Sequence, residues 1–139
     1  MIVVPFAPEH LARMRVQAAQ VTEISMIRPD AIELLAKSNG WSALDGDHPL
    51  FCGGVIDMDD HHGLLWAYVS SEAGPWMLRI TRGARRFLAL KNLRRIETSV
   101  RADFAAGCRW AALMGFENEG LMRKYGFDGS DHFRYARIT

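Results

Sequence analysis

The segment LMGFENEGLMRKYGFDGSDHFRYARI, from Leu113 to Ile138, decides the fold of this 139-residue chain. A helical pattern ends at Gly115, because glycine adopts the left-handed backbone conformation that terminates helices without a steric penalty. Phe116 can then fold back onto the apolar face of that helix. Two alternating segments follow, and alternation is typical of strands that bury one face. The segment predicts a helix and a closing pair of strands, near Glu119–Tyr125 and over His132–Ile138.

Working outward, the rest of the chain shows a regular succession of strand-like and helix-like patterns. Further strands are predicted at Ile2–Val4, Trp41–Leu44, Leu50–Ile56, Leu64–Val69 and Arg95–Val100. Helices are predicted from Pro8 through Val21 and over Ala31–Ser38, Pro75–Lys91 and Ala102–Met114. For the helix over Ala31–Ser38, Asp30 and Glu33 are the predicted capping residues and Gly40 is the predicted stop. The order β-α-α-β-β-β-α-β-α-β-β predicts an α/β (α+β) fold, a single domain over residues 1–139. Its central sheet is mixed, mostly antiparallel and flanked by helices.

The composition narrows the classes of partner. Hydrophobic residues make up 49% of the chain and charged residues 24%, as in ordinary globular proteins. A net charge of +1 gives no electrostatic footprint for nucleic acid or an anionic membrane, and no apolar run reaches membrane-spanning length. The start of the chain lacks the pattern of a signal peptide. Cys52 and Cys108 lie far apart and outside metal-type spacing. We therefore expect a cytoplasmic protein without nucleic-acid or membrane partners.

The closing segment, together with the order of elements, resembles the GNAT superfamily of acyl-CoA-dependent N-acetyltransferases. The resemblance rests on Met114-Gly115-Phe116, on Glu119-Gly120-Leu121-Met122-Arg123-Lys124-Tyr125, and on Phe133-Arg134-Tyr135-Ala136-Arg137. It implies transfer of an acetyl group from acetyl-CoA to an amine of a small molecule or a protein, and it allows a homodimer. Because a structural role explains every residue of the motif, the motif itself identifies a fold and not a reaction.

A second, non-enzymatic interpretation stays open. GNAT-like accessory or internal proteins of tailed bacteriophages are also similar to this chain, and some have an eroded cofactor loop. That likeness rests on Trp76-Met77-Leu78, Arg85-Arg86-Phe87-Leu88, Arg109-Trp110 and Leu113-Met114-Gly115-Phe116. Such a protein would serve a structural or interaction role without catalysis.

The resemblance implies that coenzyme A lies between the fourth and fifth strands, with its pyrophosphate on N–H groups where the next helix starts. The candidate cofactor-binding residues are Val69, Ser70, Ser71, Gly74, Arg79 and Arg82. The loop departs from the family pattern, since it has one glycine, an acidic Glu72 and Pro75, which lacks an N–H donor. Arg79, Arg82 and Arg86 share a helical face that could hold phosphates or simply be solvated.

For catalysis, an acetyl transfer needs a base for the amine and often an acid for the departing thiolate. Many relatives place a tyrosine acid at the position that Ala111 occupies here. Tyr125 is therefore the candidate acid, with Tyr135 second, although either residue can be an ordinary sheet aromatic. Glu97 is the candidate base, with Glu72 as the alternative, although a glutamate among arginines is often only an ion-pair partner.

Metal and thiol chemistry receive less support. The loop Asp57–His62 carries carboxylates and imidazoles, but neighbouring histidines on a strand point to opposite sides and a turn favours aspartate anyway. We therefore expect no metal site. Cys108 has no predicted base beside it and is interpreted as a small hydrophobic residue.

Overall fold

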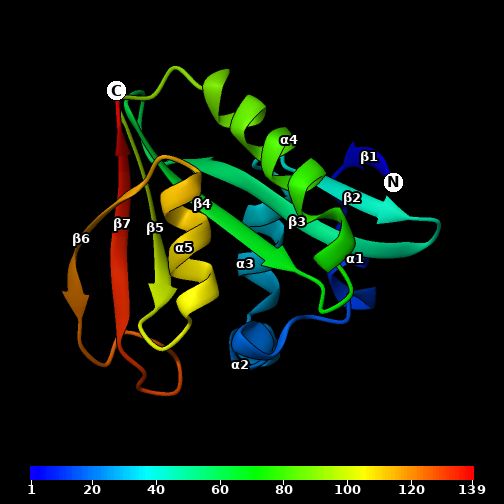
Figure 1. The fold of residues 1–139 in the computed structure, drawn as a ribbon, viewed down its shortest axis with the longest axis horizontal. Coiled ribbons are helices and arrows are strands. Elements are labelled where there is room, and N and C mark those ends of the chain that lie inside the picture. The colour runs from blue at the N-terminus through cyan, green and yellow to red at the C-terminus, as the bar shows by residue number, and fades with distance from the viewer. The chain divides into compact units, whose positions relative to one another are not determined.

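The computed structural model describes residues 1–139 as a mixed α/β fold with a seven-stranded sheet in the order β1-β2-β3-β4-β5-β7-β6 (Figure 1). The strands are β1 Ile2–Pro5, β2 Trp41–Asp45, β3 His48–Asp57, β4 His62–Val69, β5 Arg95–Arg101, β6 Glu117–Met122 and β7 His132–Ile138. The helices are α1 Pro8–Arg13, α2 Val21–Met26, α3 Pro29–Ala36, α4 Met77–Ala89 and α5 Ala105–Leu113, with short 3₁₀ turns η1 Ala18–Gln20 and η2 Gly74–Trp76. Strands β4 and β5 pair in parallel, whereas the pairs β1–β2, β2–β3, β5–β7 and β6–β7 are antiparallel. The predicted fold class, a mostly antiparallel sheet flanked by helices, is confirmed.

The chain divides into two compact units. The first comprises Met1–Ile56 and Leu65–Lys91, and the second comprises Asp57–Leu64 and Asn92–Thr139. Strand β4 contributes to both, since its first three residues pair with β5 in the second unit. None of the helices has the length and apolar character that spanning a membrane requires.

Strand β3 is the centre of the first unit because helices cover both of its faces. Residues Pro49 to Val55 are buried without alternation. Cys52 belongs to a core cluster with buried residues of α1 and α3. Its neighbour Phe51 stacks on Trp41 with ring centroids 4.6 Å apart, and Trp41 in turn lies against α4 at Gly83. Since successive strand residues point to opposite faces, α1 and α3 cover one face of β3 and α4 covers the other (Figure 1).

The predicted helix from Pro8 through Val21 is wrong, because two short helices with an extended break take its place. α1 ends at Arg13, and Val16 then forms an isolated antiparallel bridge with Ser70 just beyond β4. The N–H group of Gln17 donates to the carbonyl of Val69 at 2.9 Å. Pairing with the end of β4 therefore replaces helical hydrogen bonds in the break. Apolar spacing alone could not reveal this, because, of the four residues with helical spacing, only Leu11 and Met14 are buried, and Met14 lies in the break.

The boundaries of α3 also differ from those predicted. The helix starts at Pro29, which needs no N–H at that position, and its N-cap Arg28 makes no capping hydrogen bond. The left-handed residue after the helix is Asn39, with φ 53°, and not Gly40. Gly40 is instead required for close packing, because a Cβ there would collide with the carbonyl of Gly53.

In the second unit, α5 packs beside the antiparallel strands β5, β7 and β6, as the closing segment predicts. Gly115 has φ 92°, so the predicted left-handed helix stop is confirmed. Phe116 donates its N–H to Ala111 at 3.0 Å and is 3% exposed. Strand β6 begins at Glu117 and ends at Met122, earlier than predicted, so that Tyr125 lies in the turn after it.

Replacing Gly115 by alanine is expected to lower the free energy of unfolding by about 1 kcal/mol or more, because a Cβ in this left-handed conformation is strained even where nothing lies near it. Gly83→Ala is the matched control. Gly83 lies within α4 without a positive φ, and its new Cβ would meet Trp41 at an ordinary 3.4 Å. The control should be neutral or stabilising in urea denaturation. Equal effects of the two substitutions would contradict the left-handed stop.

Candidate functional site

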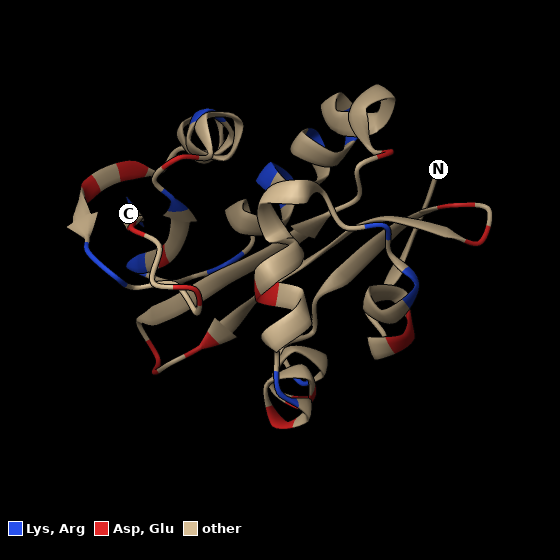
Figure 2. Cartoon of the chain, turned by 90° about the horizontal axis from the view of Figure 1, so that it is seen from below, with Lys and Arg blue, Asp and Glu red and all other residues tan.

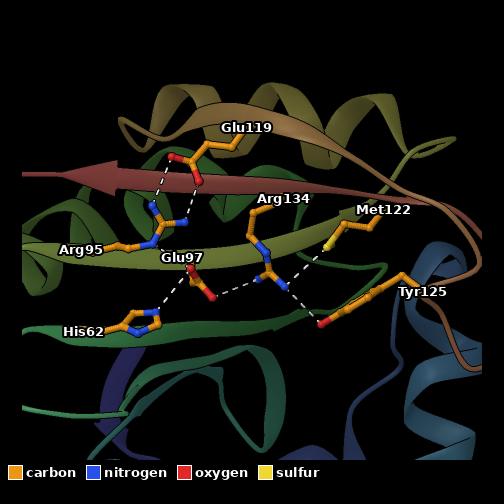
Figure 3. A network of polar contacts seen from close by, with 7 residues as sticks. All are labelled: His62, Arg95, Glu97, Glu119, Met122, Tyr125 and Arg134. Atoms are coloured by element: carbon orange, nitrogen blue, oxygen red, sulfur yellow. Dashed lines mark hydrogen bonds and ion pairs between the residues drawn. The ribbon is translucent and has the colours of Figure 1, made fainter.

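A network of polar side chains in the second unit forms on one face of β5 and β7 (Figure 3). Glu97 on β5 lies directly opposite Ala136 on β7, and Arg134 stands two residues before Ala136, so the three side chains share a face. The adjacent Tyr135 points to the other face, where it lies near Cys108 of α5. The network therefore occupies the face of these strands that α5 does not cover.

Glu97, the predicted base, is held through one of its two carboxylate oxygens. Oε2 accepts a hydrogen bond from Nε of Arg95 at 2.8 Å and lies 3.3 Å from Nε2 of His62. The His62 contact has the distance of an ion pair without the geometry of a hydrogen bond. The other oxygen, Oε1, has Nη1 of Arg134 as its polar neighbour, at 3.7 Å. The Glu97 side chain keeps 17% of its surface exposed.

Burial is the largest single influence on the pKa of Glu97, and it acts to raise that pKa. The hydrogen bond from Arg95 and the charges of Arg134, Arg95 and His62 outweigh burial, so the pKa of Glu97 lies below its ordinary value. Its carboxylate is therefore ionised at neutral pH. Such a group binds a cation well and is a weak proton acceptor, since an efficient general base has a pKa near the working pH.

Arg95 also joins β5 to the outer strand β6. Its Nη1 and Nη2 donate to the two oxygens of Glu119 at 3.1 and 2.6 Å, which is the bidentate arrangement that suits a guanidinium and a carboxylate. Glu119 stands at a bulge where the β6–β7 register shifts between Asn118 and Gly120. The hydrogen bonds from Arg95 hold the pKa of Glu119 below its ordinary value. This ion pair passes over β7, where Ala136 is small and 2% exposed.

Tyr125, the predicted acid, belongs to the same network. Its hydroxyl oxygen lies 3.4 Å from Nη2 of Arg134, whose guanidinium also lies 5.6 Å from the centre of the tyrosine ring. The ring packs against His132, and the side chain remains half-exposed. Tyr135, the second candidate, is 7% exposed, and burial is the first cause of its raised pKa. Arg134 thus brings Glu97 and Tyr125 together, whereas Tyr135 lies on the opposite face.

The predicted cofactor loop belongs to the first unit, and most of its backbone donors are already used there. The N–H groups of residues 69–73 all donate to oxygens of the same unit at 2.8–3.1 Å. In chain order, the acceptors are Gln20 Oε1, Leu50 O, Arg15 O, Ser70 Oγ and Ser70 O. Pro75 has no N–H, and Trp76 donates to Ala73. Among Val69, Ser70, Ser71 and Gly74, only Gly74 keeps its N–H available for a ligand.

Helix α4 follows this loop and carries an uncompensated positive charge. Its four arginines, Arg79, Arg82, Arg85 and Arg86, are all exposed and form no ion pair, and the helix contains no acidic residue (Figure 2). The guanidinium of Arg79 lies over the ring of Trp76, 5.5 Å from its centre. The apolar side of the helix is buried through Ile80, Ala84 and Leu88. The arginines can therefore contact an anionic ligand without first breaking a salt bridge.

The other candidates from the sequence have structural partners. Glu72, the alternative base, accepts a hydrogen bond from Arg15 at 3.0 Å on an exposed surface. In the loop Asp57–His62, Asp59 accepts the N–H of His61, which closes the turn, and His62 turns toward Glu97. No three histidine, cysteine or carboxylate side chains gather as a metal site would require. Cys108 donates weakly to the carbonyl of Arg101 at 3.8 Å.

Three residues of the network were not predicted from the sequence: His62, Glu119 and Arg134. Alternation along His132–Ile138 places Arg134 on the face opposite Tyr135, which is a signal that sequence reasoning could have used. The pairing of β5 with β7, and not with β6, is what brings Arg134 beside Glu97. Glu119 had no comparable signal, because a bulge directs its side chain.

No family model matches the sequence, and none of the curated proteins matches it significantly. Solved structures match along the whole chain. Ard1 from Thermoplasma volcanium superposes with a TM-score of 0.77 at 16% identity, over 99% of this chain and 97% of its own. A variant of the spermidine N-acetyltransferase SpeG from Vibrio cholerae gives 0.68 at 14% identity, over 99% and 95%. The NatC complex bound to Gag peptide and CoA gives 0.71 at 16% identity, over 99% and 98%.

These identities are low, and the likeness is one of fold: the chain has the fold of the GNAT acetyltransferases. The resemblance predicted from the closing segment is confirmed at that level. The phage-associated branch stays a prediction, as do the homodimer and the cytoplasmic location.

Arg95→Met is expected to raise the pKa of Glu97 and of Glu119, measured by NMR titration of their carboxyl carbons. Because the folded chain holds both pKa values down, the ion pairs add stability above the pKa of an unfolded glutamate, about 4.3. That stability is lost as the pH falls through the folded values. The gap in free energy of unfolding between the wild type and Arg95→Met should therefore shrink between neutral pH and about pH 3.

Arg94→Met is the matched control, since Arg94 is adjacent and its exposed side chain makes no ion pair. It should leave both carboxyl titrations unchanged. A titration of Glu97 that is the same in Arg95→Met as in the wild type would contradict the network.

Proposed function

We propose that the chain is an N-acetyltransferase that transfers the acetyl group of acetyl-CoA to an amine of a small molecule or a protein. The observation that carries the proposal is the acetyltransferase fold, which extends over 99% of the chain in each superposition. The amine acceptor is supported by the named activity of SpeG on spermidine, and the cofactor by the CoA bound to NatC. The polar network of Glu97, Arg134 and Tyr125 supplies groups suited to this chemistry.

The fit of acetyl-CoA to the chain rests on side chains more than on backbone. Because the N–H groups of residues 69–73 already have acceptors, they offer little to a pyrophosphate. Arg79 and Arg82 are exposed, carry no salt bridge and begin one turn after Gly74. Guanidinium groups match phosphate geometry, so these two arginines, with the N–H of Gly74, would hold the phosphates. When bound, acetyl-CoA supplies an acetyl group activated as a thioester.

Glu97 would receive the acceptor amine. Its ionised Oε1 would bind the ammonium form, which must first lose one proton to solvent because only the neutral amine attacks the thioester. A second proton would pass from the nitrogen to Oε1 as the amide bond forms. Because its pKa is held below the ordinary value, Glu97 is a weak base. Its main contribution is to hold and orient the nitrogen, and placing a reactant in this way lowers the barrier substantially.

Tyr125 would supply the proton that the leaving sulfur needs. The Arg134 guanidinium has only donors, so the tyrosine oxygen must be the acceptor in the contact between them. The O–H proton of Tyr125 is therefore free to move to the sulfur as the carbon–sulfur bond breaks. The tyrosine oxygen that remains lies 3.4 Å from the guanidinium of Arg134.

Acetyl-CoA is expected to raise the thermal stability of the protein, since a ligand that binds only the folded state adds about 2.7 kcal/mol at a hundred times its Kd. Arg79→Gln combined with Arg82→Gln should remove most of that shift. Arg13→Gln is the control, because Arg13 is exposed in the same unit without an ion pair. An unchanged melting temperature of the wild type at millimolar acetyl-CoA would rule out an ordinary transferase and favour a non-catalytic role.

Tyr125→Phe and Glu97→Gln are each expected to reduce acetyl transfer by about a hundredfold or more while the fold is retained. The assay follows release of CoA with spermidine, lysine and a short peptide as acceptors. Glu117→Gln is the control, because Glu117 lies exposed on β6 and makes no ion pair. Undiminished turnover in either variant would remove that residue from its role.

A further inference from the structure

Arg134 differs from Arg95 and Arg101, the other ion-paired arginines of the second unit, in how poorly its donors are used. Its contacts lie at 3.4 Å to Tyr125, 3.6 Å to the sulfur of Met122 and 3.7 Å to Glu97. By contrast, Arg95 and Arg101 each make hydrogen bonds to carboxylates at 2.8 Å or less. Charge-assisted hydrogen bonds between a guanidinium and a carboxylate are normally about 2.7–2.9 Å long. The 21%-exposed side chain of Arg134 therefore retains strong donors for an incoming anion.

Glu97 has a carboxylate oxygen that lacks a hydrogen-bond donor. All of its short contacts go to Oε2, whereas Oε1 has Arg134 as its polar neighbour at 3.7 Å, too far for a hydrogen bond. An acceptor and a donor of opposite charge thus face each other, 3.7 Å apart, on the sheet face opposite α5 (Figure 3). Arg95 already holds Oε2, so Oε1 is the oxygen of Glu97 that is left for a ligand.

The charges of this face select among ligands. Arg95 and Arg134 are positive, and Glu97 and Glu119 are negative, so their formal charges cancel. A phosphate or a dicarboxylate would add uncompensated negative charge beside Glu97, and a polyamine would add positive charge beside Arg134. A zwitterion adds no net charge and offers one group of each sign at close spacing, as the facing pair requires.

We propose that Arg134 and Glu97 recognise an amino acid as the acceptor, with Arg134 binding its carboxylate and Glu97 Oε1 binding its ammonium group. This deepens the function proposed above and rests on it, since the ammonium nitrogen is the atom to be acetylated. The carboxylate turns the amine toward Glu97, so Arg134 determines specificity.

The experiment measures binding in the absence of acetyl-CoA, so that it does not depend on catalysis. Glycine, alanine and lysine are titrated against their carboxamides, which keep the amine and lack the anionic carboxylate. The readouts are calorimetry and the NMR shift of the Arg134 Nε–H group. We expect at least one amino acid to bind about tenfold or more tightly than its carboxamide, the advantage of one charge-assisted pair.

Arg134→Gln should abolish this preference for the carboxylate. Arg134→Lys keeps the positive charge and should retain part of the preference. It therefore separates loss of the charge from misfolding of the Arg134→Gln variant. Arg123→Gln is the control, because Arg123 is exposed in the β6–β7 turn without an ion pair. Equal binding of acids and amides, no binding of any acid, or a preference that survives Arg134→Gln would overturn the inference.

The two proposals fail in different ways. Selective binding of amino acids without any acetyl transfer would refute the transferase and leave the zwitterion site standing. Acetylation of spermidine or a peptide that is indifferent to Arg134→Gln would support the transferase and overturn the zwitterion site.

Discussion

The bidentate attachment of Arg95 to Glu119, with its additional hydrogen bond to Glu97, is the interaction on which the polar face of the second unit depends. One guanidinium connects the first residue of β5 with the bulge of β6, across the intervening strand β7. Its planar fork fixes both carboxylates at once, which a lysine ammonium could not do. With Oε2 of Glu97 hydrogen-bonded to Arg95, the other oxygen faces Arg134 at 3.7 Å.

The cofactor loop and the break between α1 and α2 are two aspects of one arrangement in the first unit. The chain leaves α1 early and pairs at Val16 with Ser70, and Gln20 binds the backbone of β4 through its side chain. These contacts satisfy the loop's N–H groups, which cannot be left unpaired at low cost when they are partly buried. The loop is thus held by its own unit, and in the proposed function the arginine side chains on α4 would bind the phosphates instead.

The fold could be predicted further than the site because different physical signals govern them. Gly115 and the alternation of the closing strands are local signals, and together they predicted α5, β6 and β7, although β6 starts and ends earlier than predicted. The break after Arg13 and the stop at Asn39 depend on tertiary pairing that periodicity does not report. Glu97 could be proposed from its position on a polar strand face. Its partners Arg134 and Glu119 required the strand order, because β7 lies between β5 and β6 in space although it follows both in the sequence.

The bulge that directs Glu119 toward Arg95 also lies on an outermost strand. β6 ends the sheet, and an exposed edge offers unpaired N–H and C=O groups to the strands of other molecules. Here the edge carries two glutamates, a register shift, and Gly120 with φ 134°. A second strand approaching this edge would meet interrupted spacing and negative charge. The feature that organises the polar network therefore also protects the chain against sheet extension and aggregation at β6.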